Sequence, residues 1–324
     1  MAQIGKDVGQ AAAFLRQGGL VAIPTETVYG LAGNAFNPSA VAKIFAAKNR
    51  PSFNPLITHT HNLQQVEAYV KDMPGLAIKL SQQFWPGPLT MLLQKKDIIP
   101  DIVTAGSDTV AVRIPNHPLS LKLLELLDFP LAAPSANPFG YISPTRAAHV
   151  EEQLGHKIDY ILDGGPCQVG IESTIIGFEG QKVVVYRLGG ISIEQIGEVV
   201  GPDNVNLYAG IAEQGRPRTS GMLKSHYAPG KKVIIGDLSK LISQYSSHEI
   251  ALITLKDYYP QISQDRQVAL SVSGDLNEAA QNLFSALRAL DKLPVKYILA
   301  ETMPEYGLGK AINDRLSRAA ADKD

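Results

Sequence analysis

Cysteine is almost absent from this sequence. Cys167 is the single cysteine among 324 residues, so the chain can form no internal disulfide and offers no multi-cysteine metal site. Structural disulfides are typical of oxidising compartments. Their exclusion here favours a reducing compartment, and we expect a cytoplasmic protein.

Long hydrophobic runs are also missing. No apolar stretch approaches the roughly 18 residues that a membrane-spanning helix needs. Residues 1–19 carry charge where a signal peptide has its apolar core. We therefore expect no contact with a membrane and no secretory signal.

Neither sign of charge is in large excess. Thirty Lys and Arg stand against 31 Asp and Glu, which gives a formal charge of −1. This excludes a strongly basic nucleic-acid coat protein, because tight binding to phosphates needs many cations, although a local basic patch is compatible with it. Hydrophobic residues make up 45% and charged residues 19%. Such a chain builds large cores, and its length predicts two compact units of roughly 100–200 residues each.

The N-terminal two thirds of the chain mixes predicted helices with short apolar runs. Helices are expected at 7–17, 39–47, 63–70, 75–84, 118–127 and 145–154. Strands are expected at 20–23, 55–58, 89–93, 110–114, 131–133, 160–162, 174–178 and 182–187, the last two as a hairpin. Residues 24–31 are predicted to be a loop. The mixture of hairpins and helices predicts an α/β fold with a mixed sheet.

The composition changes from about Val205 onwards. Gly210–Lys232 contains four glycines, two prolines and a cluster of basic residues, which is linker composition. Basic residues beside glycine hinges motivate the hypothesis that this segment closes as a lid over a site. Beyond it, strands at 233–235, 250–254, 268–270 and 297–300 alternate with helices at 238–245, 275–290 and 311–320. That alternation predicts a small domain with a parallel sheet.

Three common catalytic signatures are missing. The sequence has no G-x-x-x-x-G-K-[ST] phosphate loop, no H-E-x-x-H and no G-x-S-x-G. Any nucleotide must therefore be held in another way. The remaining candidates are short polar motifs beside predicted strand or helix ends, where α/β proteins tend to build their sites.

Two of these motifs suit a nucleotide. Lys48 and Arg50 follow a helix that Pro51 stops, so both cations enter a turn, and an ammonium with a guanidinium fork suits a polyphosphate. Ser135 and Asn137 leave an apolar strand and offer a hydroxyl and an amide. The alternatives are a solvated helix end for the first motif and a plain turn for the second.

Further motifs suit a small polar ligand. The loop Thr25-Glu26-Thr27-Val28-Tyr29-Gly30 either lines a polar pocket or caps the element that follows it. His59 ends an apolar strand, where a lone histidine is more often structural than functional. Arg113 lies on one face of an alternating strand, where an isolated charge is costly unless an anion meets it.

Taken together, these motifs resemble the YrdC-like threonylcarbamoyl-AMP synthase family. The resemblance lies in PTETVYGL at 24–31, Lys48 and Arg50 with RPSFNPLITH behind them, WPGPLT at 85–90, VAVRIP at 110–115, Ser135 with Asn137, GIEST at 170–174 and YRLGG at 186–190. These motifs occur in order over about residues 1–200. The string SGMLKSHYAP at 220–229 and the α/β tail are similar to the long form of the family.

The resemblance implies a fold and a reaction. It implies a twisted mixed sheet with helices around an open concavity over residues 1–205, a linker or lid over 206–232, and a small Rossmann-like α/β domain over 233–324. The implied reaction joins L-threonine, bicarbonate or CO₂, and ATP into L-threonylcarbamoyladenylate with release of pyrophosphate. This adenylate serves threonylcarbamoyladenosine modification of tRNA, which implies a downstream threonylcarbamoyl transferase complex as partner and allows weak contact with tRNA.

The resemblance also implies roles for individual residues. The catalytic nucleotide-side tetrad would be Lys48, Arg50, Ser135 and Asn137. Other residues near ATP would be Ser52, Thr109, Ser143 and Arg187, with His226 or Tyr227 of the linker closing over the nucleotide. The threonine site would consist of Thr25, His59, Arg113 and Ser173, with main chain near Ala133.

The chemistry of the substrates agrees with these residue types. Threonine needs a guanidinium for its carboxylate and small polar groups that distinguish its hydroxyl from the methyl of valine. Its carbamate attacks the α-phosphorus directly, so no enzyme nucleophile is needed, and catalysis rests on holding the reactants together and on cations around the phosphates. Mg²⁺, held mainly by those phosphates, is expected to share that load, and no metal site built by the protein is expected.

Two other functions are alternatives. Related domains of hydrogenase-maturation carbamoyltransferases form a carbamoyl adenylate, but those chains carry cysteine-rich fingers and an acylphosphatase part that are missing here. An RNA-binding module with the same fold would depend on a local basic patch alone. A plain interaction domain is a further alternative for residues 233–324.

Overall fold

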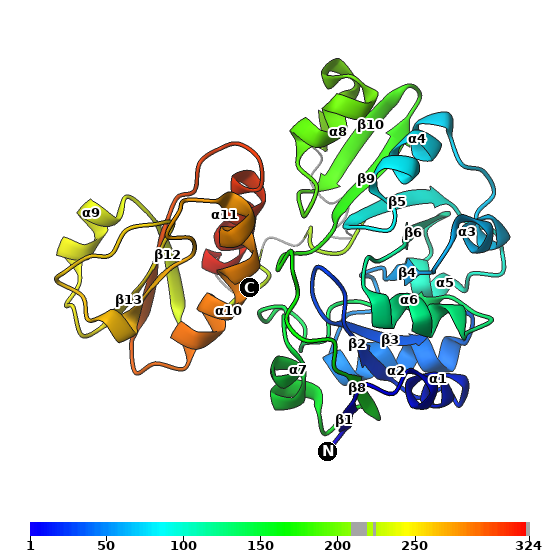
Figure 1. Ribbon diagram of the computed structural model, residues 1–324, viewed down its shortest axis with the longest axis horizontal. Coiled ribbons are helices and arrows are strands. Elements are labelled where there is room, and N and C mark those ends of the chain that lie inside the picture. The colour runs from blue at the N-terminus through cyan, green and yellow to red at the C-terminus, as the bar shows by residue number, and fades with distance from the viewer. Residues whose placement is uncertain (209–218, 223–224, 322–324) are drawn as a thin grey trace. The chain divides into compact units, whose positions relative to one another are not determined.

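The computed structural model describes residues 1–208, 219–222 and 225–321. The chain divides into two compact units (Figure 1). The first consists of Met1–Phe139, Pro144–Gln168 and Glu172–Met222, and the second of Gly140–Ser143, Val169–Ile171 and Leu223–Asp324. The change from the first unit to the second falls inside the segment predicted as a linker or lid. Residues 209–218 and 223–224 of that segment lie outside the described residues.

The first unit is built on one large mixed sheet. The described strands lie in the order β1-β8-β2-β3-β7-β4-β6-β5-β9-β10-β11. Their bounds are β1 Gln3–Gly5, β2 Val21–Ile23, β3 Gly30–Asn34, β4 Ile57–His59, β5 Leu89–Gln94, β6 Thr109–Arg113, β7 Leu131–Ala132, β8 Tyr160–Leu162, β9 Thr174–Glu179, β10 Lys182–Arg187 and β11 Val205–Leu207. Pairs such as β4 with β6 are parallel, whereas β5 with β6 and β9 with β10 are antiparallel. The prediction of a mixed sheet, with a hairpin at 174–187, is confirmed.

Several helices of this unit begin after a side chain that caps them. The helices are α1 Val8–Arg16, α2 Pro38–Lys48, α3 Leu63–Tyr69, α4 Gly75–Phe84, α5 Asp101–Thr104, α6 Pro118–Glu125, α7 Ala147–Leu154 and α8 Ile193–Val200. Asp7 caps α1, Asn37 caps α2, and Ser192 forms a capping box with Gln195. Each cap satisfies a main-chain N–H that the first helical turn leaves without a partner.

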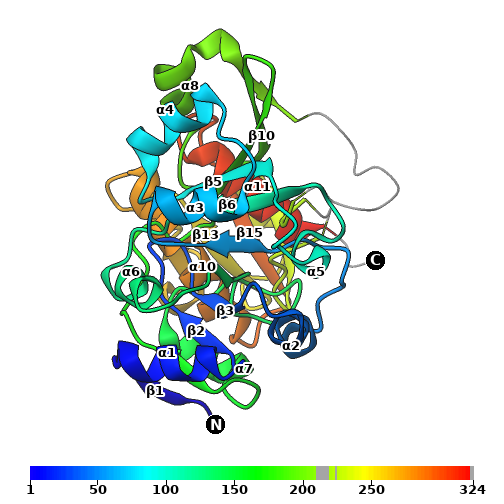
Figure 2. The same ribbon diagram turned by 90° about the vertical axis from the view of Figure 1, so that its right-hand side faces the viewer.

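Helices cover both faces of the sheet around β2 and β3. Val21 and Ile23 of β2 pack in one apolar cluster with α1 and α6. Ala22, which points to the other face, belongs to a second cluster with α2 and α7. The alternation follows from the two-residue period of a strand. Figures 1 and 2 both show α1 and α2 beside this end of the sheet and α4 and α8 beside β9 and β10 at the other end.

Between these ends, one face of the sheet carries a small apolar strip. The strip consists of Ile57, Ala111 and Ile175, with Leu92 and Tyr186 packed against them. All five lie on strands or at a strand end, and no residue of a described helix belongs to this cluster. Ile57, Ala111 and Ile175 are nevertheless buried, and Thr219 and Ser220 line a small cavity together with Ile57, Leu92 and Ala111.

The second unit contains a four-stranded sheet in the order β12-β15-β13-β14, and every described pair in it is parallel. The strands are β12 Lys232–Gly236, β13 Ile250–Thr254, β14 Gln267–Ala269 and β15 Tyr297–Glu301, and the helices are α9 Leu238–Leu241, α10 Leu276–Asp291 and α11 Gly309–Ala320. The predicted small α/β domain with a parallel sheet is confirmed. Its boundaries at 206, 232 and 233 stay predictions.

Several elements differ from the sequence-based expectation. The predicted loop 24–31 was wrong at its end, because Gly30 already begins β3. Gly-Leu-Ala-Gly-Asn has low strand propensity, and pairing with β2 and β7 on either side decides its conformation. Strands β1 and β11 and helices α5 and α8 were not predicted. The helix expected at 238–245 is only α9 followed by the 3₁₀ turn Ile242–Gln244.

Candidate active site

The predicted threonine-side residues gather where several strands of the first unit begin or end. His59 at the end of β4 pairs in register with Arg113 at the end of β6 and, on its other side, with Leu131 of β7. Ser173 precedes β9, beside Thr90 at the start of β5. The sheet order thus brings together motifs that are more than 100 residues apart in the sequence.

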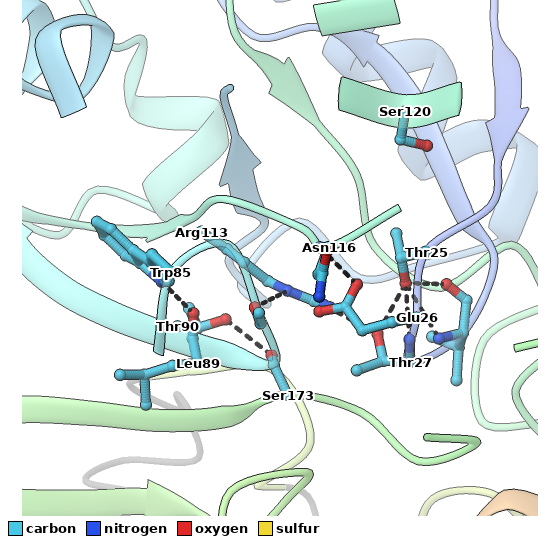
Figure 3. A network of polar contacts seen from close by, with 12 residues as sticks. Thr25, Glu26, Thr27, Trp85, Leu89, Thr90, Arg113, Asn116, Ser120 and Ser173 are labelled. Carbon is cyan, nitrogen blue, oxygen red and sulfur yellow. Dashed lines mark hydrogen bonds and ion pairs between the residues drawn. The ribbon is translucent and has the colours of Figure 1, made fainter. Parts of the chain in front are cut away.

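Arg113 is buried and forms an ion pair with Glu26. Its Nη2 lies 2.7 Å from Oε1 of Glu26, and both side chains are about 95% shielded from solvent. Figure 3 shows the Glu26 carboxylate between Arg113 and Asn116, whose main-chain N–H donates to Oε2 at 3.0 Å. Arg113 also donates to Oγ1 of Thr27 at 2.9 Å and to the carbonyl of Gly87 at 3.2 Å. The anion that sequence reasoning required for Arg113 is therefore present in the chain itself.

Thr25 acts within its own loop. Its hydroxyl donates to the carbonyl of Val28 at 2.7 Å and accepts from the N–H groups of Thr27 and Val28. It also lies 2.8 Å from the hydroxyl of Thr27. The sequence allowed either a pocket lining or a cap for this motif, and these contacts form a capping turn. The turn holds Glu26 and Thr27 against Arg113 (Figure 3).

His59 is a buried, neutral imidazole. Its Nδ1 lies 3.2 Å from the carbonyl oxygen of Ile57. Burial, and then the nearby charge of Arg113, lower the pKa of His59 to about 3. The main-chain N–H of Ala133 donates to the same Ile57 carbonyl at 2.9 Å, so the predicted main-chain contributor lies beside this histidine. A neutral imidazole here can exchange hydrogen bonds with a ligand without adding charge.

Ser173 links the predicted threonine and nucleotide sides. Its hydroxyl lies 2.7 Å from that of Thr90 and accepts from Nη2 of Arg187 at 3.0 Å. Arg187 also donates to the main-chain carbonyl of Ser173 and, through Nη1, to the hydroxyl of Ser220 at 3.2 Å. Arg187 thereby fixes Ser173 from the end of β10.

The four residues predicted to hold the nucleotide form two separate groups: Lys48 contacts Ser135 and Asn137, and Arg50 has other partners. Lys48, the last residue of α2, donates to the main-chain carbonyls of Ser135 and Asn137. Burial, and then the charge of Arg50, place the pKa of Lys48 well below its usual range. Arg50 turns away after Asn49, which adopts the left-handed conformation at φ 52°. The turn predicted from Pro51 is present, and the lysine meets the Ser135-x-Asn137 loop directly.

Arg50 is fixed by a separate set of partners. It donates to the side-chain and main-chain oxygens of Asn54 and to the carbonyl of Pro55. The ring of Phe139, two residues after Asn137, lies over its guanidinium at 5.8 Å. Ser52 in the same turn is exposed. Sequence reasoning missed Asn54, which lies within the string RPSFNPLITH that it singled out, and Phe139, which lies two residues beyond Asn137.

A cavity of about 560 Å³ opens over β5, β6, β9 and β10. Thr109, which is half-buried and lies 3.0 Å from the hydroxyl of Ser107, is one of its lining residues. Its apolar wall includes Leu92 and Tyr186. The Tyr186 ring lies over Gly177, where an added Cβ would come within 2.8 Å of the ring. A glycine at this position of β9 lets the tyrosine lie flat against the sheet.

Three predicted ATP-side residues belong to the second unit. The main-chain carbonyl of Ser143 accepts from Nε of Arg288 at 3.3 Å. Tyr227 is buried between the ring of Phe284, 5.5 Å away, and the guanidinium of Arg315, 5.3 Å away. The ring of His226 packs edge-on against Tyr227 at 4.1 Å. Within this unit, all three therefore contribute to a packed core.

No group of three or more His, Cys, Asp or Glu side chains among the described residues could hold a metal ion. No helix in this part of the chain is long and apolar enough to cross a bilayer.

Comparison with known proteins identifies relatives of both units. A family model described as "Telomere recombination" matches residues 13–189, and one described as "Threonylcarbamoyl-AMP synthase, C-terminal domain" matches residues 191–321. The threonylcarbamoyl-AMP synthase of Pyrococcus abyssi is 41% identical over 321 residues, which cover 96% of this chain and 93% of that protein. The Bacillus subtilis synthase is 41% identical over 325 residues, covering 98% and 93%.

A solved structure is similar over the whole length. The crystal structure of P. abyssi Sua5 complexed with L-threonine has a TM-score of 0.89 at 38% identity, and the match covers 99% of this chain and 97% of that one. The sequence matches and this structural match agree on both the fold and the order of the two domains. The resemblance seen in the motifs is thereby confirmed, and the chain belongs to the two-domain, Sua5-type family of threonylcarbamoyl-AMP synthases.

Proposed function

We propose that the first unit carries out the synthesis of L-threonylcarbamoyladenylate, the reaction of its family, at the ends of β4 and β6. The reaction consumes L-threonine, bicarbonate or CO₂, and ATP, releases pyrophosphate, and serves threonylcarbamoyladenosine modification of tRNA. The observation that carries the proposal is a buried guanidinium, Arg113, paired in register with the neutral imidazole of His59. A cation beside uncharged polar groups is what a hydroxylated amino acid requires.

On the threonine side, Arg113 takes the carboxylate. Its contacts with Glu26, Thr27 and Gly87 hold the guanidinium in one orientation, which limits the entropy lost on binding. His59 and Ser173 offer hydrogen bonds for the threonine hydroxyl and amine, and Thr25 maintains the loop from behind. The main chain near Ala133 closes this side of the pocket.

On the nucleotide side, Lys48 and Arg50 supply positive charge to the phosphates. Both are buried at the turn that meets the Ser135-x-Asn137 loop, and a buried cation interacts with an anion more strongly than an exposed one. Ser52, Thr109 and Arg187 of the first unit also belong to this group, and the roles of Ser143, His226 and Tyr227, which belong to the second unit, stay predictions. Burial, and then the charge of Arg50, lower the pKa of Lys48 in the free protein, and the negative charge of a bound phosphate would raise this pKa and favour the protonated form.

The adenine ring suits the cavity over β5, β6, β9 and β10, where Leu92 and Tyr186 form the edge of the apolar strip. Leu92 and Tyr186 line the cavity there, and Thr109 lies at its edge. A purine needs a flat apolar surface with a few polar groups at its rim. The strip offers that surface on strands that also lead toward Arg113 and Ser173.

The chemical step needs no nucleophile from the protein. The unprotonated amine of threonine attacks CO₂ with loss of a proton, or bicarbonate with loss of water, and forms a carbamate. A carbamate oxygen then attacks the α-phosphorus while pyrophosphate leaves in line. Lys48 and Arg50 stabilise the charge on the phosphoryl oxygens and on the leaving group. The protein also holds the two substrates together, which removes much of the entropic barrier.

Mg²⁺ and macromolecular partners belong to the same proposal. Because the described residues contain no cluster of metal-ligating side chains, any Mg²⁺ would enter with the phosphates of ATP and be held mainly by them. The adenylate passes to a downstream threonylcarbamoyl transferase complex, with at most weak contact to tRNA, in the cytoplasm.

The test is a reconstituted reaction. Labelled L-threonine, bicarbonate, ATP and Mg²⁺ are incubated with the full chain, and pyrophosphate and the labelled adenylate are quantified. We expect both products in equal amounts and their loss in Arg113→Ala. Product from carbamoyl phosphate instead of threonine would reassign the chain to carbamoyl-adenylate chemistry. Steeply salt-dependent tRNA binding without any adenylate would point to an RNA-binding module.

A further inference from the structure

Glu26 is a buried carboxylate that is not among the residues proposed to contact threonine or the nucleotide. It is 4% exposed, and both of its oxygens are engaged, one by Arg113 and one by the N–H of Asn116 (Figure 3). A buried carboxylate is expensive to keep, and removing one partner of a buried pair costs more than the pair contributes. Its place directly behind the guanidinium indicates a function for its charge.

The contacts of Arg113 leave part of its fork for a ligand. Within the described residues, Gly87 and Thr27 accept hydrogen bonds from Nε and Nη1, whereas Nη2 forms the ion pair with Glu26 and no hydrogen bond. A guanidinium has five N–H groups, so one N–H of Nη1 and both of Nη2 lie outside these hydrogen bonds. Arg113 can therefore hold Glu26 and an added carboxylate at the same time.

The histidines and the cysteine around this pair add no net charge. His59 is neutral at physiological pH, because burial and Arg113 lower its pKa to about 3. The thiol of Cys167, the other titratable group affected by both Glu26 and Arg113, stays protonated because burial raises its pKa. His117 near Glu26 has its pKa lowered by burial. The positive charge of Arg113 and the negative charge of Glu26 thus offset each other, and Arg187, which donates to the hydroxyl of Ser173, is a further cation of the site.

We propose that Glu26 is a specificity-determining residue, which offsets the charge of Arg113 so that the pocket binds a zwitterion in preference to a simple carboxylate anion. In the binding step, before the amine loses its proton for carbamate formation, the carboxylate of the α-amino acid pairs with Arg113 and its ammonium balances Glu26. A hydroxy acid without the ammonium leaves one uncompensated negative charge in a buried site, which is costly. This inference rests on the proposed threonine site.

The experiment compares two ligands on three proteins. The dissociation constants of L-threonine and of (R)-3-hydroxybutanoate, which is threonine without its amine, are measured by calorimetry for the wild type, Glu26→Gln and Glu26→Asp. Glutamine keeps the size of the side chain and an acceptor for Asn116 but removes the charge. Glu67→Gln on the exposed surface of α3 is the matched control, since it also removes one negative charge.

We expect the wild type to prefer threonine by about 100-fold or more, and this preference to fall at least about 10-fold in Glu26→Gln. It should persist in Glu67→Gln and in Glu26→Asp, where a shorter carboxylate weakens both ligands alike. An unchanged preference in a folded Glu26→Gln protein would overturn the inference. Should that variant fail to fold, wild-type protein that binds (R)-3-hydroxybutanoate as tightly as threonine would overturn it as well. Absence of threonine binding to the wild type would instead refute the proposed site.

Discussion

The ammonium group of Lys48 donates a hydrogen bond to the main-chain carbonyl of Ser135, and this contact ties the end of α2 to the loop that follows β7. A second bond from the same ammonium reaches the carbonyl of Asn137. Lys48 therefore has two tasks in the proposed mechanism: it shapes the loop that carries Ser135 and Asn137, and it presents charge to the phosphates. Its distance in sequence from that loop, 87 positions, explains why the motif Lys-x-Arg alone could not show the first task.

The first prediction concerns this lysine. Lys48→Ala should lower the turnover number about 100-fold or more, because a preorganised cation near the transferring phosphoryl group is lost. The dissociation constant of threonine should change less than about threefold, since Arg113 and His59 are untouched. Pyrophosphate release and threonine calorimetry measure the two quantities.

A neighbouring lysine provides the control for that experiment. Lys43 lies on the same helix and donates to the carbonyl of Gly18. Lys43→Ala removes a helix lysine without touching the Ser135 loop, and it should leave turnover near the wild-type value. Equal losses of turnover and of threonine binding in Lys48→Ala would contradict the proposal that Lys48 acts at the phosphates.

The second prediction concerns pH and His59. Its pKa is about 3 in the folded protein against an ordinary 6.5, so between these values the unfolded chain binds a proton that the folded one does not. The titration of His59 therefore leaves the free energy of unfolding undiminished above about pH 6.5 and lowers it progressively as the pH falls toward 3. From pH 7 to pH 5 this single group should lower the free energy of unfolding by about 2 kcal/mol.

Chemical denaturation at the two pH values checks this expectation. The free-energy loss between pH 7 and pH 5 should be smaller by about that amount in His59→Gln than in the wild type. His248→Gln, which removes an exposed histidine of the second unit, should retain the wild-type loss. If the free energy of unfolding falls as much between pH 7 and pH 5 in His59→Gln as in the wild type, the imidazole already carries a proton in the folded protein.

The third prediction concerns the hydroxyl pair Thr90 and Ser173. Thr90→Val removes the partner 2.7 Å from Ser173 and leaves Ser173 with Arg187 alone. Because a buried hydrogen bond contributes about 1 kcal/mol, the KM for threonine should rise roughly 5- to 10-fold with kcat nearly unchanged. Steady-state kinetics at saturating ATP separates the two constants.

Thr58→Val is the matched comparison for Thr90→Val. Thr58 is equally buried on a neighbouring part of the sheet, and the described residues offer its hydroxyl no hydrogen-bond partner. Its replacement should leave the KM unchanged and stability equal or higher, because a buried unsatisfied hydroxyl is removed. A similar rise in KM for both variants would show that the strand, not the hydroxyl pair, is responsible.

Whether a structural element could be predicted from the sequence depends on how far apart in the chain the residues that determine it lie. Helix α2 and the β9–β10 hairpin could be predicted because their apolar spacing and turn residues are local. Strand β3 could not, since Gly30–Asn34 becomes a strand only through pairing with β2 and β7.

The site divides in the same way. Residue types at Lys48, Arg50 and Arg113 indicated anion binding from their own chemistry, and the motif resemblance implied what each would hold. The pairing of Arg113 with Glu26 joins positions 87 apart, because the Thr25 turn after β2 meets the end of β6. The spacing of the two residues in the sequence does not indicate such a contact. The role of Glu26 therefore emerges only when the charges around Arg113 are counted in three dimensions.

The final prediction tests the adenine surface. Gly177→Ala places a Cβ 2.8 Å from the ring of Tyr186, so the ring must leave its flat position over β9, at a cost of about 1–3 kcal/mol in stability. If the purine rests on this strip, the KM for ATP should rise about 10-fold while threonine binding stays constant. Gly75→Ala, at a helix start where an added Cβ meets nothing within 4 Å, should change neither constant. A destabilised Gly177→Ala protein with unaltered KM for ATP would mean that the base binds elsewhere, because Tyr186 cannot support the ring from its displaced position.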